Sequence, residues 1–384
     1  MTAFLLRRLL QAAFVMLAMS VLVFLGVFAI GDPVEILVSP QADQAERARI
    51  IADLGLDRPL WEQYLHFLGN ALRGDLGRSF AYNEPALRLI LHRLPATLEL
   101  AASAMLIALV IGLPLGLFAG LPPRTLPLRV IVLVAGLCFS LPALWLARVL
   151  LDQLPGGAGP AAAAALALLA LGLPAGLAAG VLPRDLPARA IMAGSILGFS
   201  LPTFWVGLLL IMVFAVQLGW LPSTGRGATV AVLGVEWSFL TADGIAHLIL
   251  PALNLALFNI SLMVRLVRAG VRETMLTEFV KFARAKGLSP RRIVLVHVLK
   301  AIMIPVVTVL GLEFGQTVAF SVVTESVFAW PGVGKLIVDS IYQLDRPVIV
   351  AYLMLIVLLF ILINLAVDLA YSLLDPRVRL GGRA

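Results

Sequence analysis

The sequence predicts an all-α integral membrane protein, a polytopic bundle of about eight transmembrane helices. Three observations lead to this fold class. Of the 384 residues, 61% are hydrophobic and only 13% are charged, and the mean hydropathy is +1.02. The apolar runs reach the length of about 20 residues that crosses a bilayer core of about 30 Å. Lys and Arg residues gather in the short connections between alternate runs, as in proteins that follow the positive-inside rule.

The same composition excludes several other classes. The net charge of +7 does not indicate nucleic-acid binding, because the positive residues flank apolar spans, where they set the orientation of the chain. The single cysteine, Cys138, lies in an apolar run and predicts neither a disulfide framework nor a thiolate metal site. No metal site and no cofactor are therefore expected.

The first span is predicted from Leu9 to Ile30, directly after Arg7 and Arg8. This run is longer than the apolar core of a cleaved signal peptide, so we expect an uncleaved helix with its N-terminus in the cytoplasm. The positive connections then share the cytoplasmic side with both termini. The other spans are predicted at residues 97–120, 130–151, 161–181, 190–216, 247–267, 301–323 and 348–374.

The segment between the first two spans is long enough to cross the membrane whatever its charge. Within it, Leu60–Leu76 is amphipathic and predicts one or two short helices near the outer surface. The chain is accordingly expected to divide into an N-terminal transmembrane helix (1–31), a periplasmic segment with short amphipathic helices (32–95), transmembrane helices (96–267), a cytoplasmic loop (268–300), two C-terminal transmembrane helices with an outer loop (301–375) and a cytoplasmic tail (376–384).

Part of the transmembrane region is a tandem duplication. Residues 111–150 repeat as residues 171–210, and 20 of the 40 aligned positions are identical, including a Pro-Arg-x-Leu-Pro-x-Arg connection. One helix pair is thus added, and everything that follows keeps its side of the membrane. Each copy carries glycines at every fourth position, which predict close helix packing: Gly112, Gly116 and Gly120, then Gly172, Gly176 and Gly180.

The most informative loop holds nine of the 29 Lys and Arg residues, between Arg265 and Lys300, and only two acidic residues. The spacing predicts a helix over 268–286, with Phe279, Phe282, Ala283 and Lys286 on one face. Gly287 is expected to end this helix in the left-handed conformation. Ser289 and Pro290 are then expected to begin a second helix, as its N-cap and first residue. By spacing alone, either a docking element or an ordinary connecting loop remains open.

No enzyme site is visible in the sequence. Gly332–Lys335 has the letters of a partial phosphate-binding loop, but Ala329 replaces the first required glycine and Leu336 the Ser or Thr that would bind magnesium. The four histidines are scattered and form no metal-binding motif. Pro331, Gly332 and Gly334 instead predict a turn before a short outer helix.

Polar residues inside the predicted spans are the remaining clue. Glu313 and Gln316 lie one turn apart in the seventh span, and Asn254 and Asn259 lie in the sixth. A carboxylate at membrane depth is costly and usually faces the bundle interior or water, so Glu313 is the better pathway candidate. Helix–helix hydrogen bonding remains the alternative for Asn254, Asn259 and Asn364, and Asp368 is expected near the inner interface. The predicted translocation-path residues are Glu313, Gln316 and Asn259.

Several motifs together resemble the inner-membrane permeases of binding-protein-dependent ABC importers, in the dipeptide, oligopeptide and nickel group. The loop sequence ARAKGLSPRR, followed by His297 and Ile304–Pro305, resembles the EAA loop of that family. The resemblance covers almost the whole chain apart from the extra sixty residues. The other matching segments are LGLDRPLWEQY (54–64), RGDLGRS (73–79), RLPATLEL (93–100), LGWLPSTGRG (218–227), ESVFAWPGVGKL (325–336) and LLDPRVRL (373–380).

The resemblance implies a type I ABC-importer permease with a six-helix core and a duplicated helix pair, in the bacterial inner membrane. It implies a second permease subunit, two cytoplasmic ATPase subunits that hydrolyse the ATP, and a periplasmic or lipid-anchored substrate-binding protein. Lys281 stands where the family name would place Glu, a departure that is common in the peptide group. Phe282 and Ala301 replace the more polar residues that the resemblance leads us to expect. The implied ATPase-coupling residues are Phe279, Lys281, Phe282, Ala283, Arg284, Ala285, Lys286 and Gly287.

Several points stay open at this stage. An ion-coupled secondary transporter also shows repeats and intramembrane acids, although its repeats would be inverted across both halves. A permease made inert by the added helix pair would serve only as a membrane scaffold. The 190–216 helix is expected to take the place of the family's third helix, and the first copy's helix is the alternative. The cargo, whether a dipeptide, oligopeptide, glutathione-like peptide, nickel chelate or opine, is not specified by the sequence.

Overall fold

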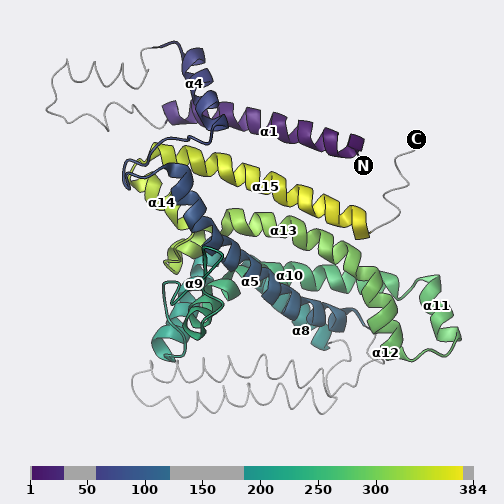
Figure 1. Ribbon diagram of the computed structural model, residues 1–384. Coiled ribbons are helices and arrows are strands. Elements are labelled where there is room, and N and C mark those ends of the chain that lie inside the picture. Colours follow the sequence, from purple (N-terminus) through teal and green to yellow (C-terminus); the bar gives the residue numbers. More distant parts are fainter. Residues whose placement is uncertain (1, 30–57, 122–185, 375–384) are drawn as a thin grey trace, which may run out of the picture. The chain divides into compact units, whose positions relative to one another are not determined.

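The computed structural model describes residues 2–29, 58–121 and 186–374 (Figure 1). They belong to two compact units. The first unit takes in Met1–Met105, Pro202–Leu255 and Thr308–Ala384, and the second takes in Leu106–Leu201 and Ala256–Val307. The predicted spans at 130–151 and 161–181, and the second glycine ladder, lie outside the described residues.

In the first unit, helix α1 (Thr2–Ala29) lies alongside helix α15 (Arg346–Leu374), as Figure 1 shows in purple and yellow. The predicted amphipathic segment forms one helix, α4 (Leu60–Leu72), which packs on the later part of α1. The Tyr64 hydroxyl lies 2.9 Å from the Ser20 hydroxyl, and the Tyr64 ring meets the Phe24 ring edge-on at 5.4 Å. A polar and an aromatic contact therefore hold α4 to α1.

The turn and short helix predicted after Pro331 are also present. Gly332 begins helix α14 (Val333–Tyr342), which packs against α15. Their apolar faces meet the start of helix α5 (Ala86–Gly120) around the buried side chains of Ile90, Leu336 and Val348. Burial of these side chains is the main force that holds α5, α14 and α15 together in the first unit.

One element departs from the all-α prediction. Strands β1 (Val230–Val232) and β2 (Val235–Trp237) form an antiparallel hairpin in which Val230 pairs with Trp237. Leu233 and Gly234 connect them, and both have positive φ, 55° and 78°. That conformation matches the right-handed twist of a two-residue hairpin. This hairpin was not predicted, because Leu rarely adopts positive φ.

The predicted span at 190–216 is interrupted. Helix α8 (Leu186–Ser200) ends before Pro202, and helix α9 (Thr203–Leu210) and the π-helix η1 (Ile211–Gln217) follow. Pro202 has no N–H to donate to the preceding turn, so a proline at this position breaks the ladder of helical hydrogen bonds. The chain passes from the second unit to the first at this break.

The first glycine ladder packs helices in the second unit as predicted. Gly112, Gly116 and Gly120 of α5 face Met263, Val267 and Val271 of helix α10 (Ala242–Thr274). A Cβ atom on these glycines would lie 2.6 to 2.8 Å from those side chains, which is too close for any residue larger than glycine without a shift. The ladder therefore allows the two backbones to approach closely.

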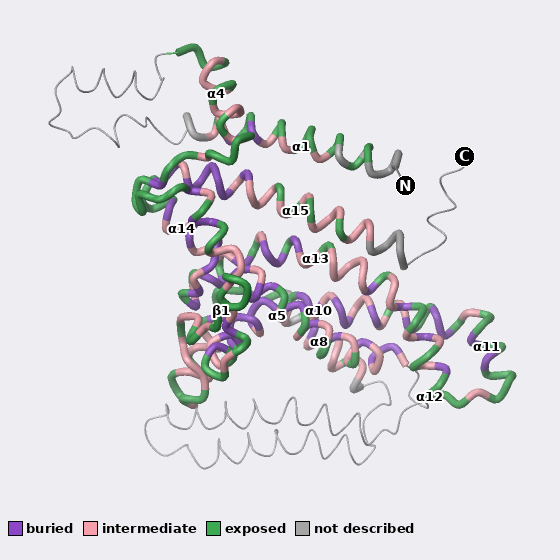
Figure 2. Tube along the Cα trace, viewed as in Figure 1, coloured by how far each residue is buried: buried purple, intermediate pink, exposed green. Residues whose placement is uncertain are grey.

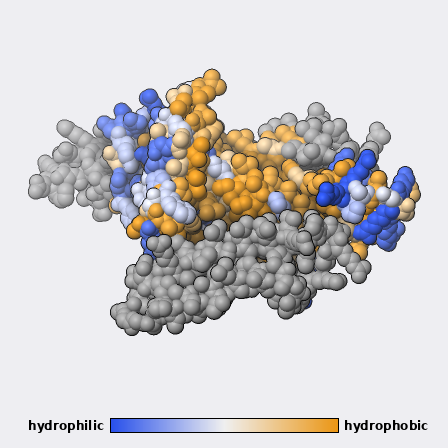
Figure 3. Space-filling view, turned by 90° about the horizontal axis from the view of Figure 1, so that it is seen from below, coloured by the Kyte–Doolittle hydropathy of each residue, from blue (hydrophilic) through white to orange (hydrophobic). Residues whose placement is uncertain are grey.

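Four described helical stretches are long and apolar enough to cross a membrane: Ala86–Gly120, Ala242–Thr274, Pro290–Val327 and Arg346–Leu369. Leu10–Gly26 and Thr203–Gln217 are shorter apolar helices. Along α1, most residues that Figure 2 colours are exposed or only partly buried, and Figure 3 shows broad hydrophobic areas on the face it presents. Exposed apolar surface of this extent is typical of helices that face lipid.

Candidate functional site

The predicted loop helix forms, but it is shorter than the sequence indicated. The prediction of one helix over 268–286 is wrong, because α10 ends at Thr274 and helix α11 begins only at Glu278 (α11, Glu278–Ala285). The Thr277 hydroxyl donates to the Thr274 carbonyl at 2.6 Å. In a continuous helix that carbonyl would accept the N–H of residue 278 instead, so the threonine side chain stabilises the break.

Gly287 ends α11 in the predicted manner. Its φ is +73°, its N–H donates to the Arg284 carbonyl at 2.9 Å, and the Leu288 N–H donates to the Ala283 carbonyl at 3.2 Å. These two hydrogen bonds define the Schellman motif, which needs a residue in the left-handed conformation at this position. A Cβ atom on Gly287 would meet nothing within 4 Å. The glycine is thus required by the backbone and not by packing.

The next helix begins where Ser289 and Pro290 predicted it. The Ser289 hydroxyl accepts the Arg292 N–H at 3.4 Å, and Pro290 is the first residue of α12 (Pro290–Arg292). The π-helix η2 (Ile293–Val298) and helix α13 (Leu299–Val327) continue it without a break. Only Lys286 to Ser289 separate α11 from a helical stretch that enters the membrane.

The two faces of α11 differ in burial. Val280 and Ala283 are buried, and α11 packs on η2 in the second unit. Phe279 and Phe282 are 47% and 62% exposed, and the Lys286 ammonium lies 4.6 Å from the centre of the Phe282 ring. Ala283 therefore faces the chain's own core, and the outward surface consists of the two phenylalanines and Lys286. We call this surface the aromatic face of α11.

Charged groups surround the aromatic face. The Lys281 ammonium pairs with the Glu278 carboxylate at 2.8 Å, and both side chains are exposed. An exposed pair of this kind contributes little to stability, about 0.3 kcal/mol. The Arg284 guanidinium lies 4.0 Å from the Met275 sulfur, which is at most a weak contact. These side chains leave the aromatic face accessible while their charges surround it.

The three predicted path residues are not brought into one unit. Glu313 is half-buried and Gln316 is exposed, both on the part of α13 that belongs to the first unit. Asn259 is buried in the second unit. Asn254, by contrast, donates to the Thr324 hydroxyl at 2.9 Å, which agrees with the alternative of helix–helix hydrogen bonding.

Two helical residues of the first unit, Glu325 and Glu99, have buried carboxylates that were not predicted as sites. Glu325 of α13 accepts hydrogen bonds from the Thr97 hydroxyl at 2.7 Å, the Ser321 hydroxyl at 2.8 Å and the Lys335 backbone N–H at 3.0 Å. It thereby joins α5, α13 and α14. Its fully buried carboxyl group is satisfied by these donors, as a buried polar group must be.

The second carboxylate, Glu99 of α5, is also buried. The Arg226 guanidinium binds it at 2.6 Å, and the backbone N–H groups of Ser238 and Phe239 each donate to it at 2.8 Å. Arg226 also lies 5.8 Å from the Trp330 ring. The sequence signal that could have predicted these two sites is the position of acidic residues inside apolar helical runs, since such residues are rarely left without a role.

Comparisons with known proteins place this chain in a family. Residues 172–380 match the family described as "Binding-protein-dependent transport system inner membrane component", and residues 1–101 match its N-terminal region. At lower similarity, an inward-facing structure of the MetNI methionine ABC transporter has a TM-score of 0.47 at 19% identity, covering 76% of this chain and 99% of that one.

Three curated relatives align over nearly their full length. The Di/tripeptide transport system permease protein DppB of Pseudomonas aeruginosa (strain UCBPP-PA14) is 34% identical, over 91% of this chain and 90% of its own. The Dipeptide transport system permease protein DppB of Escherichia coli (strain K12) is 31% identical, over 99% of both chains. The Glutathione transport system permease protein GsiC of Escherichia coli (strain K12) is 34% identical, over 99% of both chains. This chain therefore belongs to the family of binding-protein-dependent transport system inner membrane components.

Proposed function

We propose that this permease imports di- or oligopeptides, or a related small solute, and that α11 receives the force of ATP hydrolysis from a separate ATPase. The observation that carries the coupling role is the aromatic face of α11, which is exposed and holds the Lys286 ammonium over the Phe282 ring. The names of the relatives support a peptide-type cargo, since they concern dipeptides, tripeptides and glutathione. Family membership does not favour an ion-coupled secondary transporter.

The aromatic face offers enough surface to bind a protein cleft. A phenylalanine buries roughly 200 Å² when it is fully covered. Phe279 and Phe282 expose 47% and 62% of their area, so covering both would remove roughly 220 Å² from water. At about 25 cal/mol per Å², this corresponds to roughly 5 kcal/mol before the costs of association. An amphipathic helix seated in a groove is a common recognition mode.

The connection after α11 is suited to transmit movement. The Schellman motif at Gly287 and the Ser289 cap hydrogen-bond the short connection between α11 and α12 at both of its ends. Val280 and Ala283 fasten α11 to the second unit. A displacement of α11 by a bound ATPase would therefore move the start of the Pro290–Val327 helix, because short capped connections resist independent motion.

The assembly we propose follows from the family's dependence on a binding protein. A second, related permease would complete the membrane portion, two cytoplasmic ATPase subunits would bind the coupling loops, and a periplasmic or lipid-anchored binding protein would deliver the cargo. Both termini and the 268–300 loop would then lie in the cytoplasm, with 32–95 outside. Glu313, Gln316 and Asn259 remain our candidates for the translocation path.

Substitution of Phe282 tests the coupling role. Phe282→Ala should weaken association with the ATPase subunits by roughly ten- to a hundredfold, because roughly 120 Å² of buried apolar area is worth about 3 kcal/mol at most. The measurement is the amount of ATPase retained by the purified, membrane-inserted permease, together with cargo uptake. Phe320→Ala is the matched control, because Phe320 is 74% exposed on α13.

Equal ATPase retention in Phe282→Ala and the unmodified chain would refute docking through the aromatic face. Uptake itself separates the permease function from an inert scaffold: a strain that lacks this chain should lose uptake of its cargo. Normal uptake of every peptide in that strain would contradict the transport proposal.

A further inference from the structure

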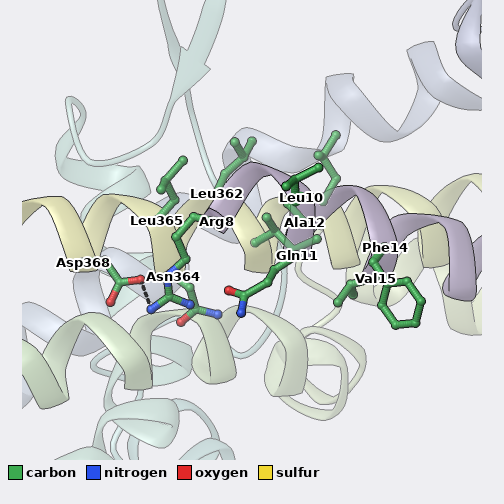
Figure 4. A pocket seen from close by; sticks show the side chains of 12 residues that line it. Arg8, Leu10, Gln11, Ala12, Phe14, Val15, Leu362, Asn364, Leu365 and Asp368 are labelled. Carbon is green, nitrogen blue, oxygen red and sulfur yellow. Dashed lines mark ion pairs between the residues drawn. The ribbon is translucent and has the colours of Figure 1, made fainter. Parts of the chain in front are cut away.

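A groove of about 770 Å³ lies between α1 and α15 in the first unit. One end of it is polar. Figure 4 shows Arg8 and Gln11 extending from α1 toward Asn364 and Asp368 of α15. The Arg8 guanidinium lies 2.5 Å from the Asp368 carboxylate, and the two side chains are 43% and 30% exposed. The ion pair is thus accessible from the groove.

The rest of the groove is apolar. Exposed side chains of both helices line it, including Leu10 and Phe14 of α1 and Leu362 of α15. Phe14 is 71% exposed, which would be costly in water for a residue beside other apolar groups. Contact with an apolar ligand or with acyl chains removes this cost.

The length of the groove matches one leaflet of a bilayer. On α1 it extends from Arg8 to Val15, about 10 Å at a rise of 1.5 Å per residue. On α15 it extends from Leu358 to Asp368, about 15 Å. Half of a hydrocarbon core of about 30 Å is about 15 Å. The polar end lies at Arg8, just before the apolar run of α1 begins, where positively charged residues typically meet lipid headgroups.

We propose that this groove binds one phospholipid whose headgroup carries both a phosphate and an ammonium group, as in phosphatidylethanolamine. The guanidinium of Arg8 presents a planar fork of donors that suits a phosphate. The Asp368 carboxylate would accept the ammonium group, and the amides of Gln11 and Asn364 supply further donors and acceptors. One acyl chain would lie along the apolar wall.

The charges at the polar end favour a zwitterionic over an anionic lipid. Sites for anionic lipids are typically clusters of basic residues. Here one carboxylate opposes one guanidinium at 2.5 Å, so the pair carries no net charge. A zwitterionic headgroup matches both members, whereas an anionic headgroup would leave Asp368 beside a second negative group. A helix of the second permease subunit is the competing occupant.

Native mass spectrometry of the full chain tests the proposal. The protein would be released from nanodiscs that contain equal amounts of phosphatidylethanolamine and phosphatidylglycerol. We expect a retained phospholipid with about a threefold excess of phosphatidylethanolamine, the factor that one partly exposed ionic contact provides. Asp368→Asn should bring the ratio to about one, because the ammonium group loses its partner, and Arg8→Gln should lower retention of both lipids.

The matched control is Asp339→Asn on α14. Asp339 pairs with Lys335 at 2.8 Å, and these side chains are 31% and 32% exposed, so the pair resembles that of the groove. Asp339→Asn should leave the lipid ratio unchanged. If Asp368→Asn prevents insertion, Ala12→Phe fills the groove without touching the charges and should remove the retained lipid. The readout needs no transport, so it is independent of the proposed function.

Three results would overturn the proposal. The first is an equal lipid ratio in the unmodified chain. The second is an equal effect of Asp339→Asn and Asp368→Asn. The third is loss of the lipid when the second permease joins the complex, together with cross-linking of that subunit to a Leu362→Cys variant in a Cys138→Ser background. The last result would assign the groove to the partner helix.

Discussion

Substitution of Gly287 should uncouple ATP hydrolysis from transport while the chain still inserts in the membrane. The expected loss of transport per ATP increases from Gly287→Asn through Gly287→Ala to Gly287→Pro. Gly287 has a φ of +73°, and its N–H donates to the Arg284 carbonyl at 2.9 Å. Because a Cβ atom would meet nothing within 4 Å, any effect of Asn or Ala must come from the backbone alone.

The magnitudes follow from that geometry. A left-handed conformation costs an ordinary residue such as alanine about 1 to 2 kcal/mol, and asparagine less, because its short side chain tolerates this region. Proline cannot reach positive φ and has no N–H, so it loses the hydrogen bond to Arg284 as well, at a cost of about 3 kcal/mol or more. Since 1.4 kcal/mol is a factor of about ten, Gly287→Ala should open the loop about tenfold more often and Gly287→Pro more than a hundredfold.

The assay compares peptide uptake, ATPase activity and membrane insertion for the three variants. Gly287→Asn should stay close to the unmodified chain, Gly287→Ala should transport less per ATP, and Gly287→Pro should insert normally but not transport. Uptake at the unmodified level in Gly287→Pro would refute the coupling role of the loop. Equal damage by alanine and proline would refute the backbone explanation, since it would indicate a packed contact at this position.

Three other substitutions have defined outcomes. Gly116→Ala should lower the free energy of unfolding, measured by thermal denaturation in nanodiscs, by about 1 to 3 kcal/mol through overpacking against α10. Gly69→Ala is the control and should not destabilise the chain, because nothing lies within 4 Å of its Cβ position. Equal effects of the two substitutions would contradict the role of the glycine ladder. Arg226→Ala should lower the free energy of unfolding by about 3 kcal/mol, because it leaves the buried Glu99 carboxylate without its charged partner. Adding Glu99→Gln should restore part of the lost stability. An unchanged melting temperature in Arg226→Ala would count against a stabilising role of the pair. Glu313→Gln should change the rate or selectivity of cargo uptake with insertion intact, and unchanged uptake of every tested cargo would remove Glu313 from the translocation path.

Local signals predicted local structure well. Gly287 and the Ser289–Pro290 pair mark the end and the start of neighbouring helices because their effects act through their own backbone. The break at Thr277 was missed, because the apolar spacing continues across it and a threonine side chain decides where the helix ends.

Long-range contacts were beyond the sequence pattern. The Glu325 carboxylate is satisfied by Thr97, which lies 228 residues away in the chain, and Glu99 meets Arg226 across 127 residues. Hydropathy predicts that such groups need partners but not which partners they have. In the same way, the loop sequence predicted an apolar face on α11, whereas only tertiary packing determined that Ala283 is covered and Phe282 is not.

The glycine ladder also restricts how α5 and α10 can slide past each other. Its glycines are four residues apart, about 6 Å along the helix axis. A shift of a fraction of that distance would press a larger side chain of α5 onto Val267, whose Cβ would already lie 2.6 Å from a Cβ at position 116. A shift of four residues would again place glycine opposite two of the three α10 side chains. The close approach at the three glycines therefore opposes small sliding movements of this helix pair.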